Sequence, residues 1–407
     1  MSKKKACLLK STVLIILMFI LSLVLIGCGG SSEKSASSAP EESSAQKTNP
    51  TTQPKGDILI GFSGSMTGAV PLEGLRSQQG ADLAIEEINK NGGVLGKNLK
   101  LVVEDDQALA NVAVNAVNKL MSEDIVALVG PHKSSLAKAV LQIVEKNKVP
   151  FLTGGTSVSL LASKNPYFFR IRASDGIVAK VAAKFATKEL KAKNIGIFYN
   201  NDEYGTGARD VIEDYLKSVN VKFVSEGHNT GDKDLTGQII KLRKEKIDAV
   251  IIWTHGPESA VAARQFKELN LKVPIISGPA FTIKSNFLDM VDASMVEGAY
   301  SITDFCPQDS DPRVQAFVKK FHDKYKADTD YFVTTYYDAI YVLADAMKRA
   351  KSTDKEAIRK ALLETKKLQG IMSRLNANTH GELVHEAVVI QYKNKVAVVK
   401  SKVREYI

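Results

Sequence analysis

The sequence predicts an α/β fold of two lobes, each with a parallel β-sheet flanked by helices. From Asp57 onward, short apolar runs alternate with amphipathic segments. Most of the apolar runs are continuous and rich in β-branched or aromatic residues, which is typical of strands buried on both faces of a sheet. Roughly 350 residues remain after the N-terminal segments. That is large for a single hydrophobic core, so two lobes are expected.

Strands and helices alternate strictly as far as residue 303, which predicts parallel sheets with right-handed crossovers. The first helical pattern, 77–89, places Ala81, Ala84 and Ile88 on one face and ends at the Asn-Gly-Gly of 91–93, a helix-terminating signal. The expected strands are 58–62, 99–103, 125–129, 149–153, 167–171, 194–199, 221–225, 249–253, 273–277 and 298–303. The other expected helices are 112–121, 135–146, 176–190, 205–218, 235–244 and 258–269.

After residue 303 the pattern changes. Three helical patterns, 312–325, 334–351 and 353–365, follow one another, and two strands, 383–392 and 395–400, close the chain. Two alternating blocks of five strands predict two similar lobes. Open α/β sheets bind ligands beyond the carboxyl ends of their strands. A ligand is therefore expected between the two lobes.

Residues 1–27 have the three parts of a secretory signal peptide: the basic Lys3–Lys5, an apolar core at 12–26 and a small-residue exit. The core is shorter than the roughly 20 apolar residues of a spanning helix. The exit, Leu25–Cys28, resembles the lipobox of bacterial lipoproteins, in which the cysteine is acylated and the chain is cut before it. The alternative is an ordinary cleavage site beside a cysteine. Residues 28–56 are mostly Ser, Ala, Pro, Glu, Gln and Thr, which predicts a disordered tether behind a lipid anchor at Cys28.

Charge and cysteine content exclude some functions. The formal net charge of +10 falls to +6 once the four lysines of the signal segment are removed, and the remaining lysines are spread along the chain, many beside acids. This indicates a solvated surface, because nucleic-acid binding would need a basic stripe interleaved with aromatic residues. Of the three cysteines, Cys7 leaves with the signal and Cys28 carries the lipid, so Cys306 has no partner for an intramolecular disulfide.

Several motifs resemble the type I periplasmic binding proteins, in their leucine/isoleucine/valine-binding branch. The most specific are GADLAIEEIN at 80–89, GGVLG at 92–96 and LVVEDD at 101–106. Weaker matches are ILIGF at 58–62, MTG at 66–68, VGP at 129–131, Tyr204-Gly205 and TYYD at 335–338. The similarity runs from about residue 57 to the end of the chain.

The resemblance implies two Rossmann-like lobes joined by a hinge of three chain crossings. The N-lobe would comprise 57–174 plus 304–370, and the C-lobe 175–303 plus 371–407. The crossings would lie near Ala173, Thr303 and Ile371.

The resemblance also implies how a ligand is bound. The family places the ligand carboxylate at a helix N-terminus, where free N–H groups and the helix dipole favour an anion. Ser134 matches the family's carboxylate-binding serine, and Tyr204 a tyrosine that closes over the ligand. Gly155 would offer its carbonyl to the ligand ammonium, and Ser157 would replace a threonine that serves both charged groups. Thr156 is the alternative if the loop is shifted by one residue.

Three positions depart from the family pattern. Ala280 stands where an ammonium-binding acid follows Gly278-Pro279, and a buried ammonium without a carboxylate is costly. Glu73 replaces a tyrosine of the N-lobe and is a candidate for the missing charge. His255 stands in place of a second C-lobe tyrosine, with Trp253 expected in the core beside it.

Strings that imitate catalytic motifs lack their partners. Ser135–Lys138 has the Ser-x-x-Lys spacing without a Ser-Asp-Asn or Lys-Thr-Gly partner, and Gly61–Ser65 misses the nucleophile elbow. His380 and His385 do not have the spacing of a zinc helix. The other histidines of the mature chain are expected in loops or on the surface: His132, His228 and His322.

These features together predict a binding protein and no enzyme, with no cofactor and no metal. The resemblance implies an extracytoplasmic lipoprotein of an ABC importer, held to the cell membrane, which captures an amino acid or related small carboxylate by hinge closure and delivers it to permease subunits. We expect a monomer that does not bind nucleic acid. A ligand sensor of the same fold is the alternative, and an exported hydrolase is a weaker one.

Overall fold

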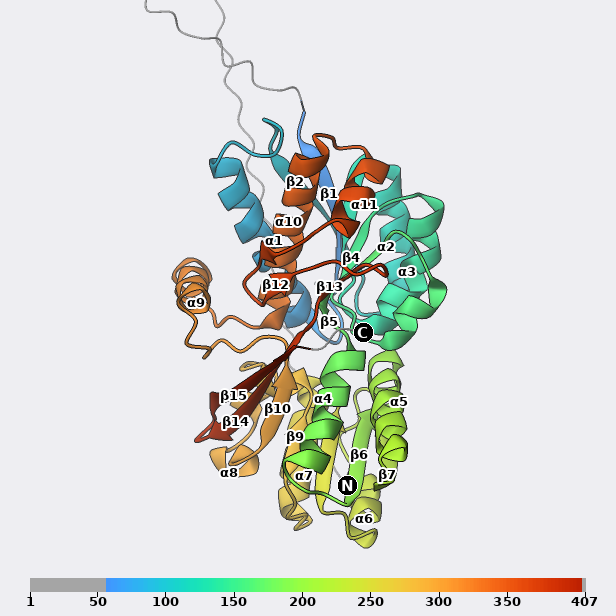
Figure 1. Ribbon diagram of the computed structural model, residues 1–407, viewed down its shortest axis with the longest axis vertical. Helices are drawn as coiled ribbons and strands as arrows, with labels where there is room; N and C mark the ends of the chain where they lie inside the picture. The colour runs from blue at the N-terminus through green and yellow to red at the C-terminus, as the bar shows by residue number, and fades with distance from the viewer. Residues whose placement is uncertain (1–55, 405–407) are drawn as a thin grey trace, which may run out of the picture. The chain divides into compact units, whose positions relative to one another are not determined.

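The computed structural model describes residues 56–404 of the chain. The predicted signal peptide, the lipidation site at Cys28 and the tether up to residue 55 lie outside the described residues. Within the described part the predicted α/β fold class is confirmed: two sheets of mostly parallel strands are covered by helices (Figure 1).

The first sheet consists of six strands, all parallel, in the order β13-β5-β4-β3-β1-β2. Strand order reverses beside β1, and ligands of open α/β sheets bind at such switch points. The strands are β1 (Ile58–Gly64), β2 (Leu99–Asp105), β3 (Ile125–Val129), β4 (Phe151–Thr153), β5 (Phe168–Ala173) and β13 (Glu382–Val384).

Helices cover both faces of the first sheet. The helices α1 (Pro71–Lys90) and α10 (Tyr331–Ala350) pack side by side on one face, and α2 (Ala110–Ser122) and α3 (Ser134–Lys146) pack on the other (Figure 1). The first pair touches backbone to backbone, because a Cβ atom at Gly80 would lie 2.1 Å from the Val333 carbonyl oxygen. The remaining elements near this sheet are η1 (Val158–Ser163), α9 (Pro312–Tyr325), α11 (Lys355–Leu363), β11 (Leu368–Gln369) and β12 (Arg374–Leu375).

The second sheet has seven strands in the order β15-β14-β10-β9-β8-β6-β7, and the last two in sequence, β14 and β15, are antiparallel to their neighbours. The strands are β6 (Asn194–Asn200), β7 (Lys222–His228), β8 (Ala249–Trp253), β9 (Ile275–Ser277), β10 (Tyr300–Thr303), β14 (Glu386–Lys393) and β15 (Val396–Arg404). The helices are α4 (Asp175–Lys188), α5 (Glu203–Ser218), α6 (Thr236–Lys244), α7 (Gly256–Glu268), α8 (Ala293–Val296), η2 (Pro279–Thr282) and η3 (Leu288–Met290).

The chain passes three times between the sheets, and the predicted position of the third passage is wrong. The first follows β5 at Ala173 and the second follows β10 at Thr303. The third lies at His385, between β13 and β14, and not near Ile371. Because β13 pairs with β5, with Glu382 opposite Arg170, residues 371–384 belong with the first sheet. The predicted strand 383–392 contains the polar pair His385-Glu386, and the structure has two strands there, one on each side of His385.

Helix α1 starts earlier than the sequence pattern indicates. The expected start at Ser77 leaves out residues 71–76, nearly two turns of the helix. Proline is well tolerated at the first positions of a helix, where its missing N–H costs nothing. Gly74 permits the helix to pack on the Ser65 backbone, because a Cβ atom there would lie 2.3 Å from the Ser65 carbonyl oxygen. The extension places Glu73 in the first helical turn, which matters for the site.

Candidate ligand site

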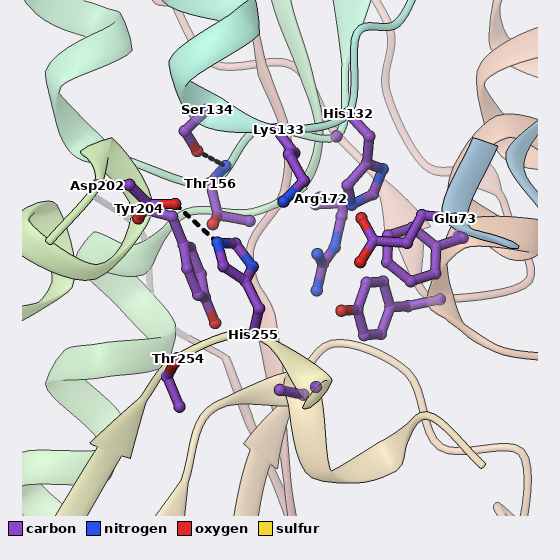
Figure 2. A pocket seen from close by; sticks show the side chains of 15 residues that line it. Glu73, His132, Lys133, Ser134, Thr156, Arg172, Asp202, Tyr204, Thr254 and His255 are labelled. Atoms are coloured by element: carbon purple, nitrogen blue, oxygen red, sulfur yellow. Dashed lines mark hydrogen bonds and ion pairs between the residues drawn. The ribbon is translucent and has the colours of Figure 1, made fainter. Parts of the chain in front are cut away.

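A cavity of about 470 Å³, counting the space open to solvent, lies where the carboxyl ends of strands from both sheets meet (Figure 2). The 15 lining residues are Glu73, His132, Lys133, Ser134, Gly154, Thr156, Arg172, Asp202, Tyr204, Thr254, His255, Gly256, Ala280, Tyr331 and Phe332.

The topology explains why residues far apart in the chain line one cavity. Parallel strands end on the same edge of a sheet, and the loops that follow them meet there. The loops after β3 and β4 and the carboxyl end of β5 contribute the lining residues of the N-lobe, together with the first turns of α1 and α10. The loops after β6, β8 and β9 contribute those of the C-lobe.

The start of helix α3 forms one end of the cavity. Ser134 is the first helical residue, and the residue before it, Lys133, makes no side-chain cap hydrogen bond. The Ser134 hydroxyl accepts hydrogen bonds from the Thr156 and Ser157 amides at 3.1 and 3.2 Å. Because a hydroxyl also carries one donor hydrogen, Ser134 can still donate to a ligand oxygen. This end of the cavity is suited to a carboxylate.

Two residues predicted in the site do not line the cavity. The side chain of Ser157 accepts from the Ser159 amide at the start of η1, and Gly155 packs against Leu160 and Ala137. Their neighbours Gly154 and Thr156 line the cavity instead. The loop therefore follows the alternative that is shifted by one residue. The Arg170 guanidinium helps to fix this register, since it donates to the Ser157 carbonyl at 3.0 Å.

The C-lobe contributes a ring pair and a partly buried hydrogen bond between His255 and Asp202. The rings of Tyr204 and His255 stack with centroids 5.3 Å apart, and His255 Nε2 lies 2.7 Å from Asp202 Oδ2 (Figure 2). Asp202 also accepts from the Gly205 amide at 2.9 Å and so caps helix α5. Burial opposes ionisation of Asp202, but the His255 partner and the Gly205 amide outweigh it and hold the pKa of this carboxyl at about 2.

A buried ion pair supports the back of the cavity. Arg172 on β5 donates to both carboxylate oxygens of Asp304, at 2.8 and 2.6 Å, and its guanidinium lies 4.0 Å from the centre of the Tyr331 ring. Asp304 also accepts from the Ala173 amide at 3.2 Å. Since Ala173 ends β5 and Asp304 follows β10, this ion pair joins the first and second crossings.

Glu73 and Lys133 face the cavity with opposite charges. Within residues 56–404, neither the Glu73 carboxylate nor the Lys133 ammonium has a hydrogen bond or an ion pair. Glu73 is only 6% exposed, and Figure 2 shows its carboxylate turned toward the interior of the cavity. A buried carboxylate without a partner is unfavourable, so this position is suited to a cationic group of a ligand.

The structure places the other sequence-predicted residues either at the cavity or in the core. Ala280 lines the cavity and brings no charge to it, whereas Trp253 is fully buried below the Tyr204 ring in the core of the C-lobe. His132 does not lie on the surface as expected, because its ring contacts Phe332 with centroids 4.5 Å apart and lines the cavity. Burial holds the pKa of His132 well below its usual value, so the ring is neutral.

Sequence reasoning missed other lining residues, and some left a signal. Arg172 lies close to the carboxyl end of β5 and is one of two arginines in this buried strand, which is unusual. Tyr331 and Phe332 precede residue 334, where the predicted helix begins, so the sequence pattern did not place them on this helix. Asp330, whose side chain accepts from the Val333 amide, is the N-cap that marks the true start of α10.

The two lobes also touch beside the cavity. Glu203 at the start of α5 accepts from Lys138 of α3 at 2.8 Å and from the Ser159 hydroxyl of η1. Ser157 packs against Gly207 of α5, where a Cβ atom would lie 2.5 Å from the serine oxygen. These contacts exist only while the lobes lie close together.

Within the part of the chain that the structure covers, no cluster of three or more His, Cys, Asp or Glu side chains is arranged to hold a metal ion. Among residues 56–404, none of the long helices is apolar enough to span a bilayer. The Cys306 thiol is buried, and burial raises its pKa to about 11.

A cavity enclosed by two α/β lobes and lined with unpaired charges and aromatic rings defines a solute-binding protein. The sequence matches the periplasmic binding protein family over residues 57–397, and the chain belongs to that family.

Relatives within the family have named ligands. The chain is 30% identical over 310 residues to the leucine-, isoleucine-, valine-, threonine- and alanine-binding protein of Pseudomonas aeruginosa, with 75% of this chain and 82% of that protein covered. It is 28% identical over 334 residues to a Leu/Ile/Val-binding protein of Rhizobium johnstonii, with 81% and 90% covered.

Solved structures agree with the fold. A leucine-binding protein from Thermotoga maritima superposes with a TM-score of 0.79 at 25% identity, covering 85% of this chain and 99% of that one. A branched-chain amino acid transporter substrate-binding protein from Streptococcus pneumoniae, in complex with isoleucine, superposes with a TM-score of 0.78 at 23% identity, covering 86% and 100%.

Proposed function

We propose that the chain is the extracytoplasmic substrate-binding lipoprotein of an ABC importer, and that it captures an amino acid between its lobes. Residues 1–27 would direct export, Cys28 would carry the lipid, and residues 28–56 would tether the lobes to the membrane. Membership in the periplasmic binding protein family and the named ligands of the relatives support the class of ligand.

One observation carries the proposal. The uncapped start of α3 at Ser134 and the unpaired carboxylate of Glu73 lie on the same cavity, so a group for a carboxylate and a group for an ammonium are both present. An amino acid zwitterion has both charges on one small frame. We therefore assign the ligand ammonium to Glu73 of the N-lobe, because Ala280 of the C-lobe carries no charge that could match it.

Capture follows from the contacts that closure adds. A ligand held by the N-lobe gains the Tyr204 and His255 surfaces only when the C-lobe approaches. Shifting a two-state equilibrium from 1:99 to 99:1 takes about 5.5 kcal/mol of differential affinity. A few charge-assisted hydrogen bonds and one buried ring contact are of that size. The contacts of Glu203 with Lys138 and Ser159 add to the closed state directly.

Glu73→Gln tests the assignment. The amide keeps the size of the side chain and removes its charge, so affinity for the α-amino acid found in a thermal-shift screen is expected to fall about tenfold to 100-fold. Affinity for the same compound without its amino group should change by less than about threefold. Calorimetric titration of both compounds measures the two effects.

Glu86→Gln on the same helix is the matched control, since its exposed carboxylate pairs with Lys324 outside the cavity. It should leave both affinities unchanged. Equal affinities of wild type and Glu73→Gln for the amino acid would reject Glu73 as the ammonium partner.

A further inference from the structure

A second helix start opens on the same cavity from the C-lobe. Helix α7 begins at Gly256, directly after β8, and its N-cap residue, His255, makes no side-chain cap hydrogen bond. The first amides of a helix have no acceptor within the helix, and because Pro257 has no N–H, those of α7 are Gly256 and Glu258. Thr254, His255 and Gly256 all line the cavity. The cavity therefore has donor groups of the backbone at both ends, at α3 in the N-lobe and at α7 in the C-lobe.

The hydroxyl of Thr254 is an independent sign of a missing partner. The residue is 1% exposed, and its Oγ1 has no hydrogen-bond partner within residues 56–404. Buried polar groups in native proteins are nearly always hydrogen-bonded. Because Thr254 lines the cavity beside the start of α7, a ligand atom is well placed to supply that bond.

The charges around the cavity favour an oxygen acceptor at this end. Lys133 lines the cavity without an ion-pair partner within residues 56–404, and the dipole of α7 adds a partial positive charge at its start, whereas the charge of Arg172 is already matched by Asp304. Asp202 is already matched by His255, and Glu73 lies with the N-lobe groups assigned to the ligand ammonium. A cationic side chain would thus be unfavourable here, and an aliphatic one would leave the Thr254 hydroxyl unpaired.

We propose that the ligand is an α-amino acid whose side chain ends in a carbonyl or carboxylate oxygen, and that Thr254 and the first amides of α7 bind this oxygen. The inference rests on the proposed capture of an amino acid and adds the chemistry of its side chain. Sites built to hydrogen-bond a polar group reject analogues that lack it much more strongly than apolar pockets reject a missing methylene.

Side chains of equal shape test the proposal. Asparagine, aspartate and leucine have the same branched skeleton of heavy atoms, and only the first two carry oxygen at its end. Calorimetric titration of the wild-type protein is expected to show asparagine or aspartate binding at least about 100-fold more tightly than leucine. Glutamine and glutamate, compared with methionine, which has a similar length but no terminal branch, test the longer side chain. The tighter member of each acid and amide pair identifies the terminal group.

Thr254→Val removes the hydroxyl and keeps the shape of the side chain. It should reduce the preference for the oxygen-bearing ligand over its apolar match at least tenfold, without weakening the apolar ligand. Thr187→Val is the control, because that hydroxyl donates to the Ala183 carbonyl of its own helix, away from the cavity. The Thr187→Val protein should prefer the oxygen-bearing ligand over its apolar match by the same factor as the wild type.

The possible failures are distinguishable. Leucine and methionine binding as tightly as all four oxygen-bearing ligands would overturn the inference and leave the proposed capture of an amino acid standing. Binding of no α-amino acid at all would overturn both. If Thr254→Val does not fold, the comparison of the matched ligands on the wild-type protein decides the question alone.

Discussion

Asp304→Asn is expected to lower the free energy of unfolding by about 3–5 kcal/mol. Asp304 is fully buried and accepts two hydrogen bonds from Arg172, which is 4% exposed. Burial alone would lower the pKa of Arg172, but the Asp304 carboxylate outweighs burial and raises it, so the guanidinium keeps its charge. The amide would leave this charge buried without a counterion. Denaturant unfolding of the ligand-free protein measures the loss.

A double variant shows whether the loss of stability comes from the unpaired Arg172 charge or from altered packing. Arg172→Met combined with Asp304→Asn removes the cation as well, and should recover at least half of the lost free energy, because no uncompensated charge remains. If the single variant unfolds at the wild-type denaturant concentration, the ion pair does not hold the two crossings together. If the double variant is no more stable than the single one, packing and not charge explains the loss.

Ser134→Ala combined with Thr156→Val is expected to weaken ligand binding at least about 100-fold. Both side chains line the cavity at the start of α3, and each hydrogen bond to a charged group contributes about 1.5–3 kcal/mol. Calorimetric titration with the amino acid of highest affinity measures the change. The unfolding transition should be recorded in parallel, since the Ser134 hydroxyl also serves the Thr156 and Ser157 amides.

Ser157→Ala is the contrast that distinguishes the two registers of the loop. Its hydroxyl is directed to the Ser159 amide and to Gly207, so affinity should change by less than about threefold. A tenfold loss for Ser157→Ala, with an unchanged affinity for the double variant, would return the binding role to Ser157 and contradict the placement of Thr156.

Much of the fold was predictable, because buried parallel strands give continuous apolar runs with clear ends. The pattern for β3 and β8 matched the structure residue for residue. The pattern failed where two strands follow each other directly, as β13 and β14 do around His385. Periodicity reports that a segment is buried, but the sheet to which it belongs depends on pairing with distant residues such as Arg170.

The resemblance to a family located part of the cavity lining from the sequence alone. Ser134, Tyr204, Glu73, His255 and Ala280 were placed by likeness to a family, and all five line the cavity. Whether Gly155 or its neighbours face the ligand depends on one residue of loop register, which no local pattern fixes.

Lys133 and Thr254 look like ordinary loop residues in the sequence. Lys133 becomes a candidate ligand contact only when the structure shows that its ammonium has no partner within residues 56–404, and Thr254 when its buried hydroxyl proves to have none there. Whether a polar group lacks a hydrogen-bond partner depends on tertiary contacts and cannot be inferred from residue type or spacing.

The most direct test is a crystal structure of the protein with the amino acid that binds most tightly. We expect the ligand's α-carboxylate within hydrogen-bond distance of the Ser134 hydroxyl and its ammonium beside Glu73, with Tyr204 and His255 closed over it. A ligand lying outside this cavity, or one with no acid group near Ser134, would contradict the proposed mode of capture.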